Sequence, residues 1–344
     1  MSYVTRFQLL YERNFRRERI FRDRRNPLDI YSDSELHERC RFNKDGLVFI
    51  VDMIGDSLSH PTRRSNALSP IEQVFIALRF YSCGTFFIVD ADTVNVSKAT
   101  VSRCVSRVSA ALKQIVHDVI RFPRNDADLQ SGKEQFFRLG FPGAVGAIDC
   151  THVRIQAPSS KEFCYVNRKS EHSINVQAVC SADRKFINVV IKWPGSVHDA
   201  RIWKESELYK DMRDGRISGI LLGDCGYGNS SNLLTPFRNP NSTAQQRYNY
   251  HHKRCRVRIE QAFGILKRRF AVLKNEIRMD PSKCCTIIAA CFVLHNIAMD
   301  LTGVSSDDLI DATENAPPEE DDRHNLDEVF GNALRNHIVN TYFS

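Results

Sequence analysis

The apolar residues of this chain change their pattern at Pro142, from helical spacing before it to short strand-like runs after it. Three such runs follow in order, GAVGAIDCTHVRIQA, HSINVQAVCSA and KFINVVIKWPG, and the last two flank Asp183-Arg184, which predicts a hairpin. A helix (DARIWKESELY), a fourth strand (GILLGD) and two long helices at 253–275 and 281–300 come next. Three antiparallel strands followed by strand and helix units predict an α/β core of the ribonuclease-H-like type.

Three acidic residues in this core stand out by their local setting. Asp149 and Asp224 each end an apolar run, so we place both at strand ends, and Glu260 lies in a basic helical pattern, RCRVRIEQAFGILKRRF. Carboxylate oxygens are the ligands that hard cations require, and two such ions can neutralise a phosphodiester, activate water and stabilise the leaving oxygen. We therefore expect Asp149, Asp224 and Glu260 to be catalytic and to hold Mg²⁺ or Mn²⁺, as two ions.

Each of these assignments has an alternative. Glu260 could be a charge partner of the arginines on its own helix. Asp199, in WPGSVHDARIW, is a fourth candidate for the metal, but it could equally cap the helix that follows it. His152 and His198 lie near acids and could orient water or substrate, or simply pack.

The helices before Pro142 resemble a DNA-reading unit. Ser69-Pro70 with Glu72 predicts one helix start, Gly84 predicts its end, and Ser97 is expected to cap the next helix, SKATVSRCVSRVSAAL. On that last helix Val101, Val105, Val108 and Leu112 form an apolar stripe. The residues left facing out, and so expected to bind DNA as a recognition helix does, are Lys98, Thr100, Arg103 and Arg107. An ordinary three-helix packing unit is the alternative.

A second set of basic residues shares the helix of Glu260. Contacts with the nucleic-acid backbone are expected from Arg254, Arg256, Arg258, Lys267, Arg268 and Arg269.

Charge is unevenly distributed along the chain. The formal net charge is +7, but residues 307–328 hold ten acidic residues and one arginine, so residues 1–306, with 46 basic and 31 acidic residues, carry +15. Seven arginines also lie between Arg13 and Arg25. A body this basic suits a polyanionic partner, and the arginine-rich arm suits nucleic acid or a nuclear address. A solvated basic surface and a plain exposed helix are the alternatives.

The remaining composition argues against two other classes of protein. Eleven scattered cysteines without a Cys-x-x-Cys pair favour reduced thiols over a disulfide framework or a zinc ribbon. We expect no apolar stretch of about 18 residues and no secretory leader, hence no membrane association.

These patterns predict five regions. They are a basic arm with a helical segment (1–60), a helix-turn-helix DNA-binding region (61–120), a linker (121–142), the ribonuclease-H-like nuclease domain (143–301) and an acidic flexible tail with a terminal helix (302–344).

Several of these segments, in this order, resemble the PIF/Harbinger transposases and the domesticated Harbinger transposase-derived nucleases of animals. The segments are ALSPIEQVFIALRFYSCG, VSKATVSRCV, GAIDCTHVRI, YVNRKSEHSINVQAVC, WPGSVHDARI, LLGDCGYG, RVRIEQAFGILKRRF and CCTIIAACFVLHNI. The resemblance implies a DDE core with Asp149, Asp224 and Glu260 as the triad, Asp199 as a further metal-site acid, and Mg²⁺-dependent action on DNA.

The resemblance also implies a biological setting. Active members of that family cut at terminal inverted repeats and join the element to short A/T-rich targets, with a Myb-like DNA-binding partner that helps bring the enzyme into the nucleus. Without that partner, some of the protein is expected in the cytoplasm. Since two DNA ends must be held together, we expect a homo-oligomer.

Three hypotheses therefore follow from the sequence. The first is a metal-dependent DNA endonuclease and strand transferase, and the second is a domesticated nuclease that no longer transposes. The third is a non-catalytic helix-turn-helix regulator.

Overall fold

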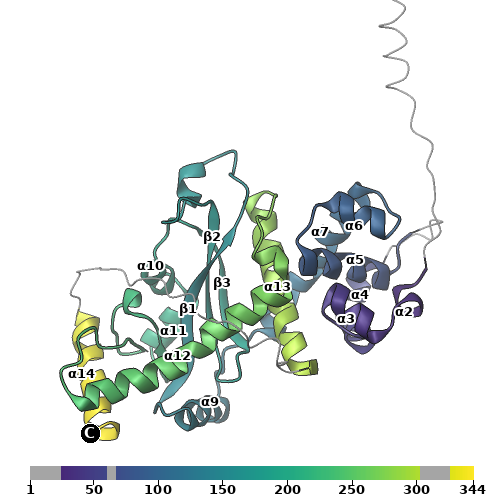
Figure 1. Cartoon of the computed structure of the whole chain (residues 1–344). Helices are drawn as coiled ribbons and strands as arrows, with labels where there is room; N and C mark the ends of the chain where they lie inside the picture. The colour runs from purple at the N-terminus through teal and green to yellow at the C-terminus, as the bar shows by residue number, and fades with distance from the viewer. Residues whose placement is uncertain (1–24, 60–66, 303–325) are drawn as a thin grey trace, which may run out of the picture.

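The computed structural model describes residues 25–59, 67–302 and 326–344 (Figure 1). Nearly all of the arginine-rich arm and most of the acidic segment of the tail therefore lie outside the described residues.

The first part of the chain is helical. Its longer helices are α3 (Asp33–Cys40), α4 (Lys44–Leu58), α5 (Pro70–Cys83), α6 (Phe87–Thr93) and α7 (Lys98–Gln114), with short helices α2 (Pro27–Ile30) and α8 (Val116–Val119). Ser69 and Glu72 form the predicted capping box at the start of α5, and Gly84, with φ 62°, ends that helix in the left-handed conformation that glycine tolerates.

Helix α7 has the expected start and buried face. The Ser97 side chain accepts a hydrogen bond from the Thr100 backbone amide, and the predicted stripe from Val101 to Leu112 is buried. This stripe packs against α5 and against α13 (Pro281–Thr302), so one continuous apolar core joins the N-terminal helices to the rest of the protein (Figure 1).

A mixed five-stranded sheet forms the second part. The strands are β1 (Ala144–Arg154), β2 (Ser173–Cys180), β3 (Phe186–Pro194), β4 (Ile220–Leu222) and β5 (Leu233–Leu234), in the spatial order β3-β2-β1-β4-β5. Strands β1, β2 and β3 pair antiparallel, whereas β4 pairs parallel to β1 and β5 parallel to β4. This is the predicted order of three antiparallel strands followed by strand and helix units.

Helices cover both faces of the sheet. Ala147, Val176 and Ala178 share an apolar core with α12 (Thr243–Arg269) and α13. The opposite face, with Ile148 and Val179, packs against α10 (Asp199–Lys204) and α11 (Glu207–Arg213). The alternation of side chains along each strand therefore supplies two separate cores.

The segment expected to be a linker, residues 121–142, contains helix α9 (Asp126–Arg138), which packs against β1. Asn125 caps its start, and Leu129 and Phe136 are buried. With so few apolar residues on one stripe, the helical pattern is weak in the sequence and depends on contact with the sheet.

Helix α13 also differs from expectation. Among the described residues it is long and apolar enough to cross a membrane by length and composition, although no such stretch was expected. However, 78% of its apolar window is buried inside the protein, against α7, α12 and β3. A central core helix surrounded by protein is apolar on all sides, which explains its composition.

Helix α14 (Leu326–Tyr342) packs against α12 and β5 and braces the connection between β4 and β5. A Cβ atom on Gly331 would lie 2.5 Å from the Ser230 backbone nitrogen, so only glycine permits this approach. The Arg335 guanidinium lies 4.0 Å from the centre of the Phe237 ring and donates to the Pro236 carbonyl oxygen.

Candidate active site

Strand pairing brings Asp149 and Asp224 to the same edge of the sheet. Ala147 pairs with Leu222 in the parallel β1–β4 ladder, and two residues farther along each chain lie Asp149 and Asp224. Asp224 follows the end of β4 as predicted, and its carboxylate accepts a hydrogen bond from the Gly226 amide. The prediction for Asp149 was wrong, because this residue lies in the middle of β1, not at its end. The strand continues to Arg154 since β2 still pairs with it after β4 has ended.

Arg256 of α12 joins Asp149 to Glu260. Its guanidinium lies 3.2 Å from the Asp149 carboxylate and also forms an ion pair with Glu260, one helical turn farther along α12. All three side chains are only about one-fifth exposed, at 22%, 18% and 23% respectively. A strand acid and a helix acid therefore share one cation in a partly buried site.

Asp199 approaches from the other side of the sheet edge. It is the first residue of α10, while His198 holds the N-cap position and forms no side-chain cap. The Asp199 carboxylate accepts a hydrogen bond of 2.8 Å from the side-chain amide of Asn175, a buried residue of β2. The capping alternative for Asp199 is thus wrong, because the N-cap position belongs to its neighbour.

Three of these acids, Asp149, Asp224 and Asp199, lie near enough to influence one another's charge. Burial raises the pKa of Asp149 to about 7, opposed by Arg256 and assisted by the charges of Asp224 and Asp199. Burial and then the Asp199 charge also raise the pKa of Asp224. Repulsion between carboxylates that are short of water is the state that a bound cation relieves.

The donor set fits a hard divalent cation. Four carboxylates supply only oxygen ligands, and a positive group, the Arg256 guanidinium, already lies between two of them. Within the described ranges no three His, Cys, Asp or Glu side chains yet converge into a compact cluster. Asp149 and Glu260 both contact Arg256 in this structure, through one carboxylate oxygen each.

The basic residues predicted on α7 fall into two groups. Lys98 and Arg103 are exposed, as expected for a DNA-facing surface. Thr100 is half-buried and bonded to Ser97, and Arg107 donates a hydrogen bond of 2.8 Å to the Leu58 carbonyl oxygen at the end of α4. Arg107 therefore tethers two helices, a role that a helical projection does not reveal.

The basic residues of α12 also separate. Arg254 is exposed, whereas Arg258 and Arg268 are half-buried. Lys267 donates to the His152 carbonyl oxygen on β1, close to the acids. Arg269 is 7% exposed, so the prediction that it faces nucleic acid was wrong, since the helix turns this position into the core. Arg256 contacts the acids themselves.

Sequence reasoning missed residues on β2 and on the β1–β2 connection. Asn175 orients Asp199, and the Gln177 side-chain amide lies 3.4 Å from the Asp199 carbonyl oxygen. Of the exposed residues Arg168 and Lys169, Arg168 contributes positive charge beside Asp224, and both act on His152. Their only sequence signal is the motif YVNRKSEHSINVQAVC, whose polar residues alternate on a strand that is otherwise apolar.

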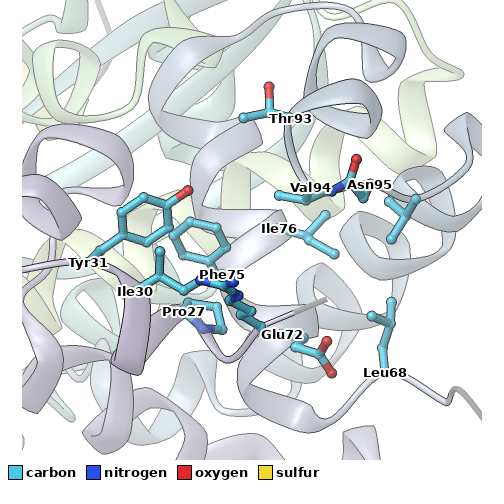
Figure 2. A pocket seen from close by; sticks show the side chains of 12 residues that line it. Pro27, Ile30, Tyr31, Leu68, Glu72, Phe75, Ile76, Thr93, Val94 and Asn95 are labelled. Atoms are coloured by element: carbon cyan, nitrogen blue, oxygen red, sulfur yellow. The ribbon is translucent and has the colours of Figure 1, made fainter. Parts of the chain in front are cut away.

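A surface pocket lies elsewhere, in the N-terminal helices (Figure 2). Tyr31, Phe75 and Ile76 point into it, and Glu72, which also lines it, belongs to the capping box of α5. The pocket is lined by residues up to position 96 and so includes none of the four acids.

Comparison with known proteins agrees with the geometry of the acids. The family described as DDE superfamily endonuclease matches residues 148–296, a span that contains Asp149, Asp199, Asp224 and Glu260. The mixed five-stranded sheet with its helices is consistent with the α/β core of such nucleases. Fold and site thus define the class as a DDE superfamily endonuclease.

The relatives narrow the class to a family. The chain is 37% identical over 327 residues to the mouse protein named "Putative nuclease HARBI1", covering 93% of both chains. The human protein of the same name is 36% identical over 326 residues, again with 93% of both chains covered. An Arabidopsis thaliana protein named "Protein ALP1-like" is 28% identical over 71% of this chain and 64% of its own length. No solved structure matches the chain. This chain belongs to the Harbinger transposase-derived nucleases.

Proposed function

We propose that this protein is a metal-dependent DNA endonuclease whose site consists of Asp149, Asp224 and Glu260, with Asp199 as a fourth acid. The observation that carries the proposal is the shared contact of Asp149 and Glu260 with Arg256, beside Asp224 at the same edge of the sheet. Two strands and a helix bring these acids close to the Arg256 guanidinium. Burying several carboxylates together destabilises the protein, and a bound metal ion would offset that destabilisation.

The residues of the chain have distinct proposed roles. Asp149 lies between Asp224, which follows the neighbouring strand, and Glu260 on α12. Its carboxylate could therefore share a bound metal ion with either of them. Asn175 fixes the orientation of Asp199 through its hydrogen bond. Mg²⁺ or Mn²⁺, when bound, would supply a Lewis acid and a water of lowered pKa. Arg256, once released, remains beside the site as a cation for the phosphodiester.

DNA is the proposed substrate. The net charge of +15 on residues 1–306 favours a polyanion, and Lys98 and Arg103 of α7 supply the exposed cations that a recognition helix needs. We propose that the N-terminal helices bind DNA as a helix-turn-helix unit. Terminal inverted repeats are the proposed site of cutting, and the freed 3′-hydroxyl would then attack an A/T-rich target.

A nuclease that cuts without transposing is the second candidate. The names of the relatives, which describe nucleases, favour it. Terminal inverted repeats flanking the gene, or many near-identical copies in the genome, would contradict this second candidate and favour a mobile element.

Cleavage assays test the nuclease proposal. Purified full-length protein with Mg²⁺ is expected to nick terminal-repeat DNA, and Asp149→Asn or Glu260→Gln is expected to lower the rate at least about a thousandfold, because transition-state charge is then unbalanced. Glu276→Gln is the matched control, since Glu276 is an exposed acid that forms an ion pair with Arg278. DNA binding without any metal-dependent cleavage would instead support the non-catalytic regulator.

We further propose nuclear action as a homo-oligomer with a Myb-like DNA-binding partner, with some cytoplasmic protein when the partner is absent. Imaging of the tagged protein with and without co-expressed partner tests the location. Light scattering of the purified protein tests the assembly, and a monomer on DNA ends would contradict it.

A further inference from the structure

We propose that the turn at residues 167–171, in the β1–β2 connection, is a phosphate clamp that holds the DNA backbone beside the scissile bond through Arg168 and Lys169. The inference rests on the proposed nuclease function, because it places the substrate strand at the acid cluster. The turn is not part of the helix-turn-helix surface or of α12.

The turn is built by buried polar contacts. The side-chain oxygen of Asn167, a residue only 9% exposed, accepts hydrogen bonds from the backbone amides of Lys169 and Glu171, at 2.9 and 3.1 Å. Its side-chain amide donates to the Ser173 hydroxyl at 3.1 Å, and Ser170 adopts a left-handed φ of 59°. A turn whose backbone is fixed at so many points presents its two exposed cations with little loss of backbone conformational entropy on binding.

The turn also lies against the acid site. The Arg168 guanidinium is 3.3 Å from Nδ1 of His198, the residue before Asp199. The Ser173 hydroxyl that supports Asn167 is also 3.0 Å from Nδ1 of His152 on β1. Arg168 further opposes the rise in the pKa of Asp224 that burial and Asp199 cause. These contacts place Arg168 at the rim of the acid site, and Lys169 follows it in the same turn with its charge acting on His152.

Charge identifies the ligand. A DNA strand that enters the site brings phosphates on either side of the scissile bond toward four carboxylates, which repel them. A metal at the carboxylates neutralises the scissile phosphate only, whereas flanking phosphates need other cations. Arg168 and Lys169 are exposed, so they can bind phosphate oxygens without a large cost of desolvation.

Arg168 could instead act only as an internal counter-charge for the acids, and the experiment separates the two roles. Arg168→Gln and Lys169→Gln are compared with Lys133→Gln, which removes the same charge from α9, at the opposite end of β1. Full-length protein is titrated with terminal-repeat DNA at several salt concentrations. Each clamp variant should lower the slope of log affinity against log salt by about 0.9, and the control should not.

Removing the charge of one phosphate at a time shows which DNA phosphates the clamp contacts. Single methylphosphonates, which lack the phosphate charge, are placed along the cleaved strand. Beside the scissile bond they should weaken binding to the wild-type protein by about tenfold or more, as expected for one charged contact, but should cause little further loss in the double variant Arg168→Gln/Lys169→Gln.

The clamp would be overturned if a methylphosphonate at every position lowered the DNA affinity of the wild type and the double variant equally. It would also be overturned if Arg168→Gln and Lys169→Gln left the salt dependence of DNA affinity unchanged. If the clamp holds but no cleavage occurs, only the proposed nuclease function fails. Unchanged melting temperatures are expected, because both side chains are exposed.

Discussion

Replacement of Arg256 by glutamine is expected to lower the free energy of unfolding of the metal-free protein and to raise its affinity for the metal ion. The guanidinium bonds two carboxylates that are about one-fifth exposed, and a hydrogen bond to a charged group contributes about 1.5–3 kcal/mol. Protonation of Asp149, whose pKa is already near 7, relieves part of the loss. We therefore expect the free energy of unfolding in EDTA to fall by about 2 kcal/mol at pH 8.

With Mg²⁺ this difference should almost vanish, because the cation then replaces Arg256 in both proteins. By linkage, a 2 kcal/mol difference that metal removes corresponds to an affinity about 30-fold tighter in the variant. Urea unfolding with EDTA or with saturating Mg²⁺ measures the stabilities, and calorimetric titration with Mn²⁺ measures the affinity.

Arg254→Gln is the control on the same helix, since Arg254 is an exposed arginine whereas Arg256 is partly buried against the acids. It should change neither quantity. Equal destabilisation of the Arg256 variant with and without Mg²⁺, or an unchanged Mn²⁺ affinity, would refute competition between this arginine and the metal.

Three further outcomes are expected. Because burial raises the pKa of Asp149 to about 7, a proton competes with the cation below that pH, so Mn²⁺ affinity measured by titration should fall about tenfold per pH unit below 7 and level off above it. The raised pKa also means that the metal-free protein loses stability as pH rises from about 4 to 7, which acid-range urea unfolding can check, and constant stability there would contradict it. Arg103→Gln should weaken DNA binding and lower the slope of log affinity against log salt by about 1. Arg107→Gln should instead lower the melting temperature with little change in that slope, because Arg107 tethers α7 to α4. Exchanged effects of the two variants would contradict these roles. Gly331→Val should loosen α14, seen as faster proteolysis of residues 326–344 and weaker Mn²⁺ binding, and wild-type behaviour in both assays would show that α14 does not brace the site.

Local chemistry explains what the sequence could predict. The capping box of Ser69 and Glu72, the cap at Ser97 and the apolar stripe of α7 depend on residues within one or two helical turns, so all three are found where expected. The antiparallel order β3-β2-β1 also follows from the succession of strand-like runs, because consecutive antiparallel strands pair with their neighbours, whereas the place of β4 beside β1 does not.

Features that depend on distant partners were not predictable in this way. The strand that carries Asp149 continues past it only because β2 pairs there, 29 residues away in the register Asp149–Ala178. The contact of Arg256 with Asp149 spans 107 residues, so the sequence suggested a DNA contact for it instead. Asn175 was overlooked because one amide on an apolar strand gives no signal until α10 is placed beside it.

The brace formed by α14 has a consequence for the timing of protein synthesis. The connection that follows Asp224 is held from one side by Gly331 and Asn332, about a hundred residues later in the chain. Gly331 lies against Ser230, and the Asn332 side-chain oxygen accepts a hydrogen bond from the Asn229 side-chain amide. A ribosome must therefore translate past these positions before the turn carrying Asp224 gains that support. During translation, and in any chain cut short before α14, the connection that carries Asp224 lacks these contacts, so this acid is expected to reach its final position only after the end of the chain has been made.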